Sequence, residues 1–196
     1  FSVLKELMEL HGNAIFGGDG YSTEWHEMAV KERGLKNIPT TADALPAFKA
    51  PEVVELFSST GVLTPAELES RFEVYSEQYV LALEVEAKLT VEMATTIIYP
   101  AAVTYLSKLG SVSAKLTPSP ADAVTAAANA MMTAVGVLET AIAKHDFATI
   151  EEHMKFLADE VRGLMDDVRA AADILETLVS DSDWPLPKYR EMLFIK

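Results

Sequence analysis

The 196-residue chain contains no cysteine, so disulfide bonds, thiol nucleophiles and thiolate metal sites are excluded. Histidine is scarce as well. None of the four begins the H-E-x-x-H pattern of zinc enzymes or follows a glutamate by three positions, as in carboxylate di-metal bundles. We interpret them as surface or interhelix residues: His11, His26, His145 and His153. The sequence therefore predicts no catalytic, cofactor-binding or metal-binding residue in this chain.

Basic residues are few, because 16 Lys and Arg stand against 30 Asp and Glu, which gives a formal net charge of −14. Nucleic acids and anionic lipid surfaces both require clustered positive charge, so neither is predicted as a partner. Several acidic residues come in pairs, but neighbouring side chains on a helix point in different directions. We interpret these pairs as solvated faces rather than metal sites: Glu84 and Glu86, Glu151 and Glu152, Asp166 and Asp167, Asp181 and Asp183.

Long uninterrupted apolar runs are also missing. The most apolar windows, 80–89 and 97–109, contain Glu or Lys and fall short of the roughly 20 residues that cross a bilayer, so no membrane contact is predicted. The first residues, FSVLKELMELHG, have the spacing of an amphipathic helix rather than of a basic leader with a cleavage site. Because the chain opens with Phe inside that helix and without a cap, we expect a piece of a longer protein.

Hydrophobic residues make up 49% of the chain, which predicts a folded protein. Residues 1–62 are predicted to form an irregular helical segment punctuated by prolines. Its first helix ends near His11, and Ser22 caps a second helix that runs to Arg33, with Gly34 as its stop.

The rest of this segment contains shorter helical pieces. Thr41 or Asp43 is predicted to cap a single turn, and residues 51–58 form a short helix that begins with proline. The strongest helix start follows at Thr64. Its side chain and that of Glu67 form a T-x-x-E capping box, with proline in the first turn.

The helix that begins there is predicted to extend over residues 65–109, about 65 Å at 1.5 Å per residue. Pro100 either kinks or breaks it. Its heptad-spaced residues predict a core-facing seam: Leu68, Phe72, Tyr75, Tyr79, Ala82 and Leu89. Glu86 falls on the same seam, so either the seam drifts around the helix or this carboxylate has a buried partner.

Two further helices carry apolar residues at alternating steps of four and three. The first seam is Val124, Ala128, Met131, Val135, Leu138 and Ile142, and the second is Ile150, Met154, Leu157, Val161, Leu164, Val168, Ala171, Leu175 and Leu178. The short link at 145–149 makes the two helices antiparallel neighbours. The sequence thus predicts an all-α fold, with an antiparallel three-helix bundle over residues 63–183 that contains one very long helix.

The tail, residues 184–196, breaks the heptad pattern. Its Trp-Pro-Leu-Pro start favours an extended, polyproline-like chain. We predict that its apolar residues pack back on the protein or on a neighbouring subunit: Trp184, Leu186, Tyr189, Met192, Leu193 and Phe194.

The segment Asn13–Pro46, NAIFGGDGYSTEWHEMAVKERGLKNIPTTADALP, resembles the part of type III glutamine synthetases that follows their catalytic core. The segment Trp184–Phe194, WPLPKYREMLF, is similar to the C-terminus of the same family, and the helices between them resemble its C-terminal region. The resemblance implies the non-catalytic C-terminal region of such an enzyme. A stand-alone helical interaction module of shared ancestry is the alternative, and an independent enzyme or metal-binding bundle is disfavoured by the absent ligand spacings.

In that family the intact enzyme joins ammonia to glutamate with ATP and Mg or Mn, and twelve subunits assemble in two rings. The resemblance therefore implies ATP and metal for the intact cytoplasmic enzyme but no cofactor in this chain. It implies the upstream catalytic domain and other subunits as partners. The GGDG run at 17–20 is then either a tight turn that positions Tyr21 and Trp25 for packing, or a loop bordering the active site or a subunit contact.

Overall fold

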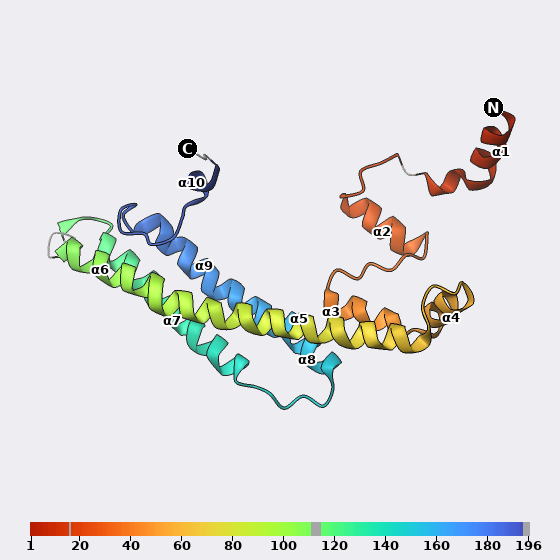
Figure 1. Cartoon of the computed structure of the whole chain (residues 1–196). Coiled ribbons are helices and arrows are strands. Elements are labelled where there is room, and N and C mark those ends of the chain that lie inside the picture. The colour runs from red at the N-terminus through yellow and green to blue at the C-terminus, as the bar shows by residue number, and fades with distance from the viewer. Residues whose placement is uncertain (16, 111–114, 194–196) are drawn as a thin grey trace. The chain divides into compact units, whose positions relative to one another are not determined.

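The computed structural model describes residues 1–15, 17–110 and 115–193, and every regular element within these ranges is helical (Figure 1). The predicted all-α class is confirmed. The chain divides into two compact units, Phe1–Pro39 and Thr40–Lys196. Residues 40–62 belong to the second unit, because their helical elements pack against the long helix. The predicted division of the chain at residue 62 stays a prediction.

The first unit contains three elements: α1 (Ser2–His11), the 3₁₀ turn η1 (Gly12–Ala14) and α2 (Thr23–Lys31). Ser22 is the predicted N-cap of α2, and its Oγ accepts a hydrogen bond from the Trp25 amide at 3.2 Å. The helix ends at Lys31, two residues earlier than expected. Gly34 has the positive φ of 66° that closes a helix, and the chain folds back so that the Leu35 amide donates to the Ala29 carbonyl.

Three short elements open the second unit: α3 (Thr41–Ala44), η2 (Leu45–Lys49) and α4 (Pro51–Ser59). The cap of α3 is Thr40 rather than Thr41 or Asp43, because Thr40 has the extended backbone that an N-cap requires and its Oγ1 accepts from the Asp43 amide at 3.1 Å. Leu45 and Ala42 bury their side chains against Phe72 and Met154 in a small cluster. This cluster fixes α3 and η2 on the bundle.

The long helix runs without a break through three segments: α5 (Pro65–Met93), the π turn η3 (Ala94–Ile98) and α6 (Tyr99–Leu109). Both hydrogen bonds of the predicted capping box are present, since Thr64 Oγ1 accepts from the Glu67 amide and Glu67 Oε2 accepts from the Thr64 amide. Pro100 does not end the helix. The wider π turn ends at Ile98, two residues before the proline, in the turn where a regular hydrogen-bond ladder would lack one amide donor and meet the proline ring.

The core-facing seam of the long helix differs from the predicted one. Its buried residues are Leu68, Phe72, Ser76, Leu83, Ala87, Ala94, Ile98 and Ala102. Phe72, Leu83 and Ala94 are 11 residues apart, and an 11-residue repeat follows a nearly straight helix, whereas a heptad repeat drifts off its face. Glu86 is consequently exposed beside buried Ala87, so the predicted drift is confirmed.

Tyr75, Ala82 and Leu89, expected in the core, are exposed for the same reason. They lie away from the 11-residue seam.

Helix α7 (Pro120–Ile142) runs back along the long helix, and α8 (Ile150–Phe156), the π turn η5 (Leu157–Val161) and α9 (Arg162–Leu178) then run in the same direction as the long helix. Helix α7 packs against α9, and the long helix contacts both (Figure 1). The heptad seams are confirmed at their centres, since Met131, Leu138, Val161 and Leu175 have no solvent exposure. Leu164 is only half-buried, because the π turn before it shifts the following residues around the helix axis.

The tail packs back only in part. Trp184 and Leu186 lie against the main core, whereas Met192 and Leu193 of α10 (Tyr189–Leu193) are exposed. Lys108 of α6 pairs with Asp183, and Lys188 Nζ lies 2.7 Å from Asp181 Oδ1, so ion pairs hold the start of the tail. Phe194 is outside the described residues.

Two helices, Pro65–Leu109 and Pro120–Ile142, are long and apolar enough to cross a membrane, with mean hydropathies of 1.2 and 1.3. The sequence analysis did not anticipate this result, because it considered shorter windows. Both helices also supply core residues of the bundle, including Ala102 and Met131, and core helices commonly pass this test. The absence of membrane contact stays a prediction.

His153 joins α8 to the link that precedes it and to α5. Its ring stacks on Phe147 with 4.3 Å between centroids, and its Nε2 lies 3.6 Å from Glu84 Oε1. Burial lowers the pKa of His153 below its usual 6.5, while the Glu84 carboxylate opposes that shift and nearby His145 adds to it. The neutral imidazole is therefore the form that the folded state prefers.

We expect Leu138→Ala to lower the free energy of unfolding by about 2–5 kcal/mol, because the side chain is fully buried and its removal leaves a cavity. Leu164→Ala should cost less, because the leucine is half-buried, and exposed Asp159→Ala should change little. Chemical denaturation of the three variants measures the loss in free energy of unfolding for each and so ranks them. Equal losses at Leu138 and Leu164 would contradict this assignment of the core.

The stability of the fold should depend on pH through His153. Because the folded pKa of His153 is lowered, the unfolded chain binds the proton first, and the free energy of unfolding falls as the pH drops below about 6.5. Glu84→Gln removes the opposing carboxylate and should steepen this fall, whereas His153→Gln should flatten it. The measurement is a set of denaturation curves between pH 7.5 and 5 for the parent chain and the two variants. An unchanged slope in His153→Gln would assign the effect to other groups.

Candidate functional site

Several acidic residues of the bundle form ion pairs between segments. Lys49 Nζ lies 2.8 Å from Glu151 Oε1, and Lys155 Nζ lies 2.9 Å from Asp43 Oδ1, so two pairs clamp α8 to the α3–η2 region. The hydrogen bond from Lys49 lowers the pKa of Glu151, and those from Thr40 and then Lys155 lower the pKa of Asp43. Both carboxylates are held in the ionised form, which suits a structural clamp rather than proton transfer.

No catalytic or metal-binding constellation assembles from the predicted candidates. Across the residues that the structure describes, no three His, Asp or Glu side chains gather closely enough to hold an ion. Of the histidines, His11, His26 and His145 lie at the ends or surface of separate segments, and only His153 is partly buried. Glu84 pairs with Lys88 at 3.5 Å, and Glu152 accepts from the Ala148 amide at the start of α8.

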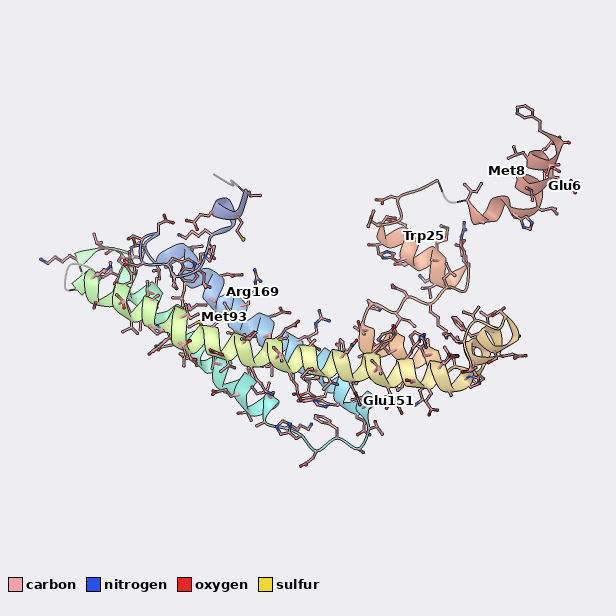
Figure 2. The ribbon with its side chains drawn as sticks, viewed as in Figure 1. Glu6, Met8, Trp25, Met93, Glu151 and Arg169 are labelled. Atoms are coloured by element: carbon pink, nitrogen blue, oxygen red, sulfur yellow. The ribbon has the colours of Figure 1, made fainter. Side chains whose placement is uncertain are left out.

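The loop at 17–20 has the geometry of a local turn. Asp19 Oδ1 accepts from the Tyr21 amide at 2.9 Å, and a Cβ at Gly17 or Gly20 would meet nothing within 4 Å. Trp25 is half-buried beneath the Arg33 guanidinium, 5.3 Å from the ring centroid, whereas Tyr21 is exposed (Figure 2). The turn therefore positions Trp25 for packing, as one interpretation predicted. The same interpretation is wrong for Tyr21, which is exposed.

Two cavities flank α9. One of 320 Å³ lies between η3, α9 and the tail, and Trp184 lines it together with Met93 and Arg169, the two of these residues labelled in Figure 2. Arg169 pairs with Asp173 at 3.4 Å, and the indole Nε1 of Trp184 is buried with no hydrogen-bond acceptor. The wall residues include no nucleophile next to a base, so the cavity offers a place for an apolar group rather than a reaction centre.

The second cavity, of 620 Å³, is an open groove between α7 and the η5–α9 segment. Small or apolar residues line it, among them Gly136, Val137 and Leu164, with Glu160 as its charged residue. This composition fits contact with another apolar surface better than binding of a charged substrate.

The most extensive features that the fold leaves unused are apolar helix faces. Helix α1 buries none of its residues, and the side chains at its helical spacing stay exposed: Val3, Leu4, Leu7 and Met8. The outer side of α5 likewise exposes Val74, Leu81, Val85 and Leu89. The sequence analysis missed the α5 face because it placed Leu89 in the core. A second apolar series at helical spacing was the signal that could have revealed it.

Comparison with known proteins gives a consistent result. Residues 1–117 match the family model of the glutamine synthetase C-terminal domain. The chain is 31% identical over 99% of its length to the type-3 glutamine synthetase of Dictyostelium discoideum and covers 28% of that protein. It is also 37% identical over 46% of its length to a glutamine synthetase of Butyrivibrio fibrisolvens, of which it covers 13%.

A third relative, a glutamine synthetase of Bacteroides fragilis (strain YCH46), is 32% identical over 56% of the chain, which covers 15% of that protein. The chain therefore spans less than a third of the length of the curated relatives it matches. The matched residues include α1, the 17–20 loop and the whole long helix. Since the family model covers more than half of the sequence, this chain belongs to the glutamine synthetase C-terminal domain family.

Proposed function

We propose that this chain is a non-catalytic part of a type III glutamine synthetase and that its role there is structural, in bracing the catalytic domain and in subunit assembly. The observation that supports this role is the pair of exposed apolar faces on α1 and α5. Apolar faces of this extent usually mark contacts with other protein surfaces. The packed helices α5 to α9 supply the support for such contacts.

The intact enzyme would ligate ammonia to glutamate at the expense of ATP, in the cytoplasm, with Mg or Mn as its metal. The residues for that chemistry would lie in sequence that precedes the region represented here. In this proposal no side chain of the bundle touches substrate, nucleotide or metal. The partners are the catalytic domain and the other subunits of the same protein.

The assembly role predicts the behaviour of the intact enzyme. Deleting residues 64–196 removes the bundle, and we expect the deletion variant to assemble into smaller particles than the parent protein. Analytical ultracentrifugation of both proteins measures the difference, and circular dichroism serves as the control for folding. A deletion variant that keeps the full assembly would contradict the proposed assembly role.

The non-catalytic assignment predicts that residues 1–196 alone show no γ-glutamyl transferase activity with glutamine, hydroxylamine, ADP and Mn²⁺. The physical reason is that the described residues bring together no acid–base pair or metal-ligand set of the kind this chemistry needs. The assay is run beside the intact enzyme at equal molar concentration. Turnover that survives repurification of the chain would assign catalysis to the bundle.

A further inference from the structure

The outer face of α5 has a distinctive order of residues. Val74, Leu81, Val85 and Leu89 follow one another at helical steps on the side opposite the buried seam, with side chains 44–63% exposed. Gln78 occupies the position on the same face between Val74 and Leu81. The centre of this face carries no charged residue, although the whole chain has a net charge of −14.

One basic and one acidic residue lie at the two ends of this outer face. Arg71 lies one helical step before Val74, and Glu92 lies one step after Leu89. Both are exposed, and they stand about 32 Å apart along the helix at 1.5 Å per residue. The guanidinium of Arg71 donates to the carbonyl of Glu67, one turn away on the same helix.

We propose that this face binds the same face of a second copy of the chain, with the two α5 helices antiparallel. In that arrangement Arg71 lies opposite Glu92 of the second copy at both ends, and Val74 lies opposite Leu89. Leu81 and Ala82 meet near the two-fold axis. The contact is isologous, as in most protein dimers, because one surface serves both partners.

Charge decides the orientation. A parallel pairing would place Arg71 against Arg71 and Glu92 against Glu92, whereas the antiparallel pairing neutralises all four charges. These matched charges are needed to bring two strongly acidic chains together.

The proposal of this contact rests on the proposed assembly role. It names the α5 face as the surface used in assembly and a second copy of the chain as the partner. The two can be separated by experiment, since the contact is tested on residues 1–196 alone and the assembly role on the intact enzyme. If the deletion variant loses its assembly while this chain stays monomeric, the assembly role stands and the antiparallel contact is wrong.

The first test reverses the charges. Sedimentation velocity at low ionic strength should show self-association of the chain, and Arg71→Glu or Glu92→Arg should each weaken it about tenfold or more. An equimolar mixture of the two variants should restore association, because each copy then offers the charges that the other needs. Failure of the mixture to recover, or a monomeric parent chain, would overturn the proposal.

The apolar centre is tested by Leu81→Glu against Ile174→Glu. The two side chains are 63% and 53% exposed, so neither change removes a core residue, but Ile174 lies on α9. Only Leu81→Glu should abolish association. Equal effects would assign the association to nonspecific apolar contact and count against the proposed face.

Cysteine cross-linking tests the register, since the natural chain has no thiol. Ala82→Cys should form a disulfide-linked dimer on mild oxidation. Val74→Cys should cross-link with Leu89→Cys in a mixture but hardly with itself, because the two copies of residue 74 lie about 22 Å apart along the antiparallel pair. Rapid self-linking of Val74→Cys would indicate a parallel pair and contradict the proposal.

Discussion

A helix of 45 residues must keep one face on its core from end to end, and this constraint shapes the rest of the bundle. A heptad seam would wind around so long a helix unless the helix supercoils. The chain instead uses an 11-residue spacing, so that Phe72, Leu83 and Ala94 all stay on the buried side, and a π turn at 94–98 follows. Small residues along this seam let α7 and α9 approach the long helix closely.

The ends of the bundle are held by ion pairs as well as by apolar packing. At one end, Lys49 and Lys155 reach across from separate segments to Glu151 and Asp43. At the other end, Lys108 and Lys188 hold the tail through Asp183 and Asp181. Exposed pairs of this kind contribute about 0–1 kcal/mol each, so they set the position of segments more than they add stability.

Local chemistry made part of the fold predictable. The caps at Ser22 and Thr64 follow from the residue types alone, because a hydroxyl next to a first helical turn has few better partners than the free amides. The α7 seam was predictable because its large apolar residues Val124, Met131 and Leu138 recur every seven residues on one face.

The remaining differences have physical causes that local patterns do not contain. On the long helix, Tyr75 and Leu89 fit a heptad better than alanine and serine do, so these large side chains indicated the wrong face, whereas Tyr79 does pack against the core. The π turn at 157–161 displaced Leu164 in the same way, since one extra residue in a turn leaves no mark on composition. The candidate site was harder still, because an interaction surface is defined by what the rest of the fold fails to cover.

That uncovered surface links stability to assembly. The inner face of α5 is made partly of Ser76 and Ala87, which contribute little apolar area, while branched aliphatic residues such as Leu81 and Val85 face outward. A helix that served only its own bundle would gain more by the opposite arrangement, since burying a Val or Leu side chain contributes about 1.5–3 kcal/mol. Covering the outer face would therefore add apolar burial comparable to a substantial part of a domain's net stability. A bundle built in this way should be more stable in an assembly than alone, because the contact and the fold draw on the same helix.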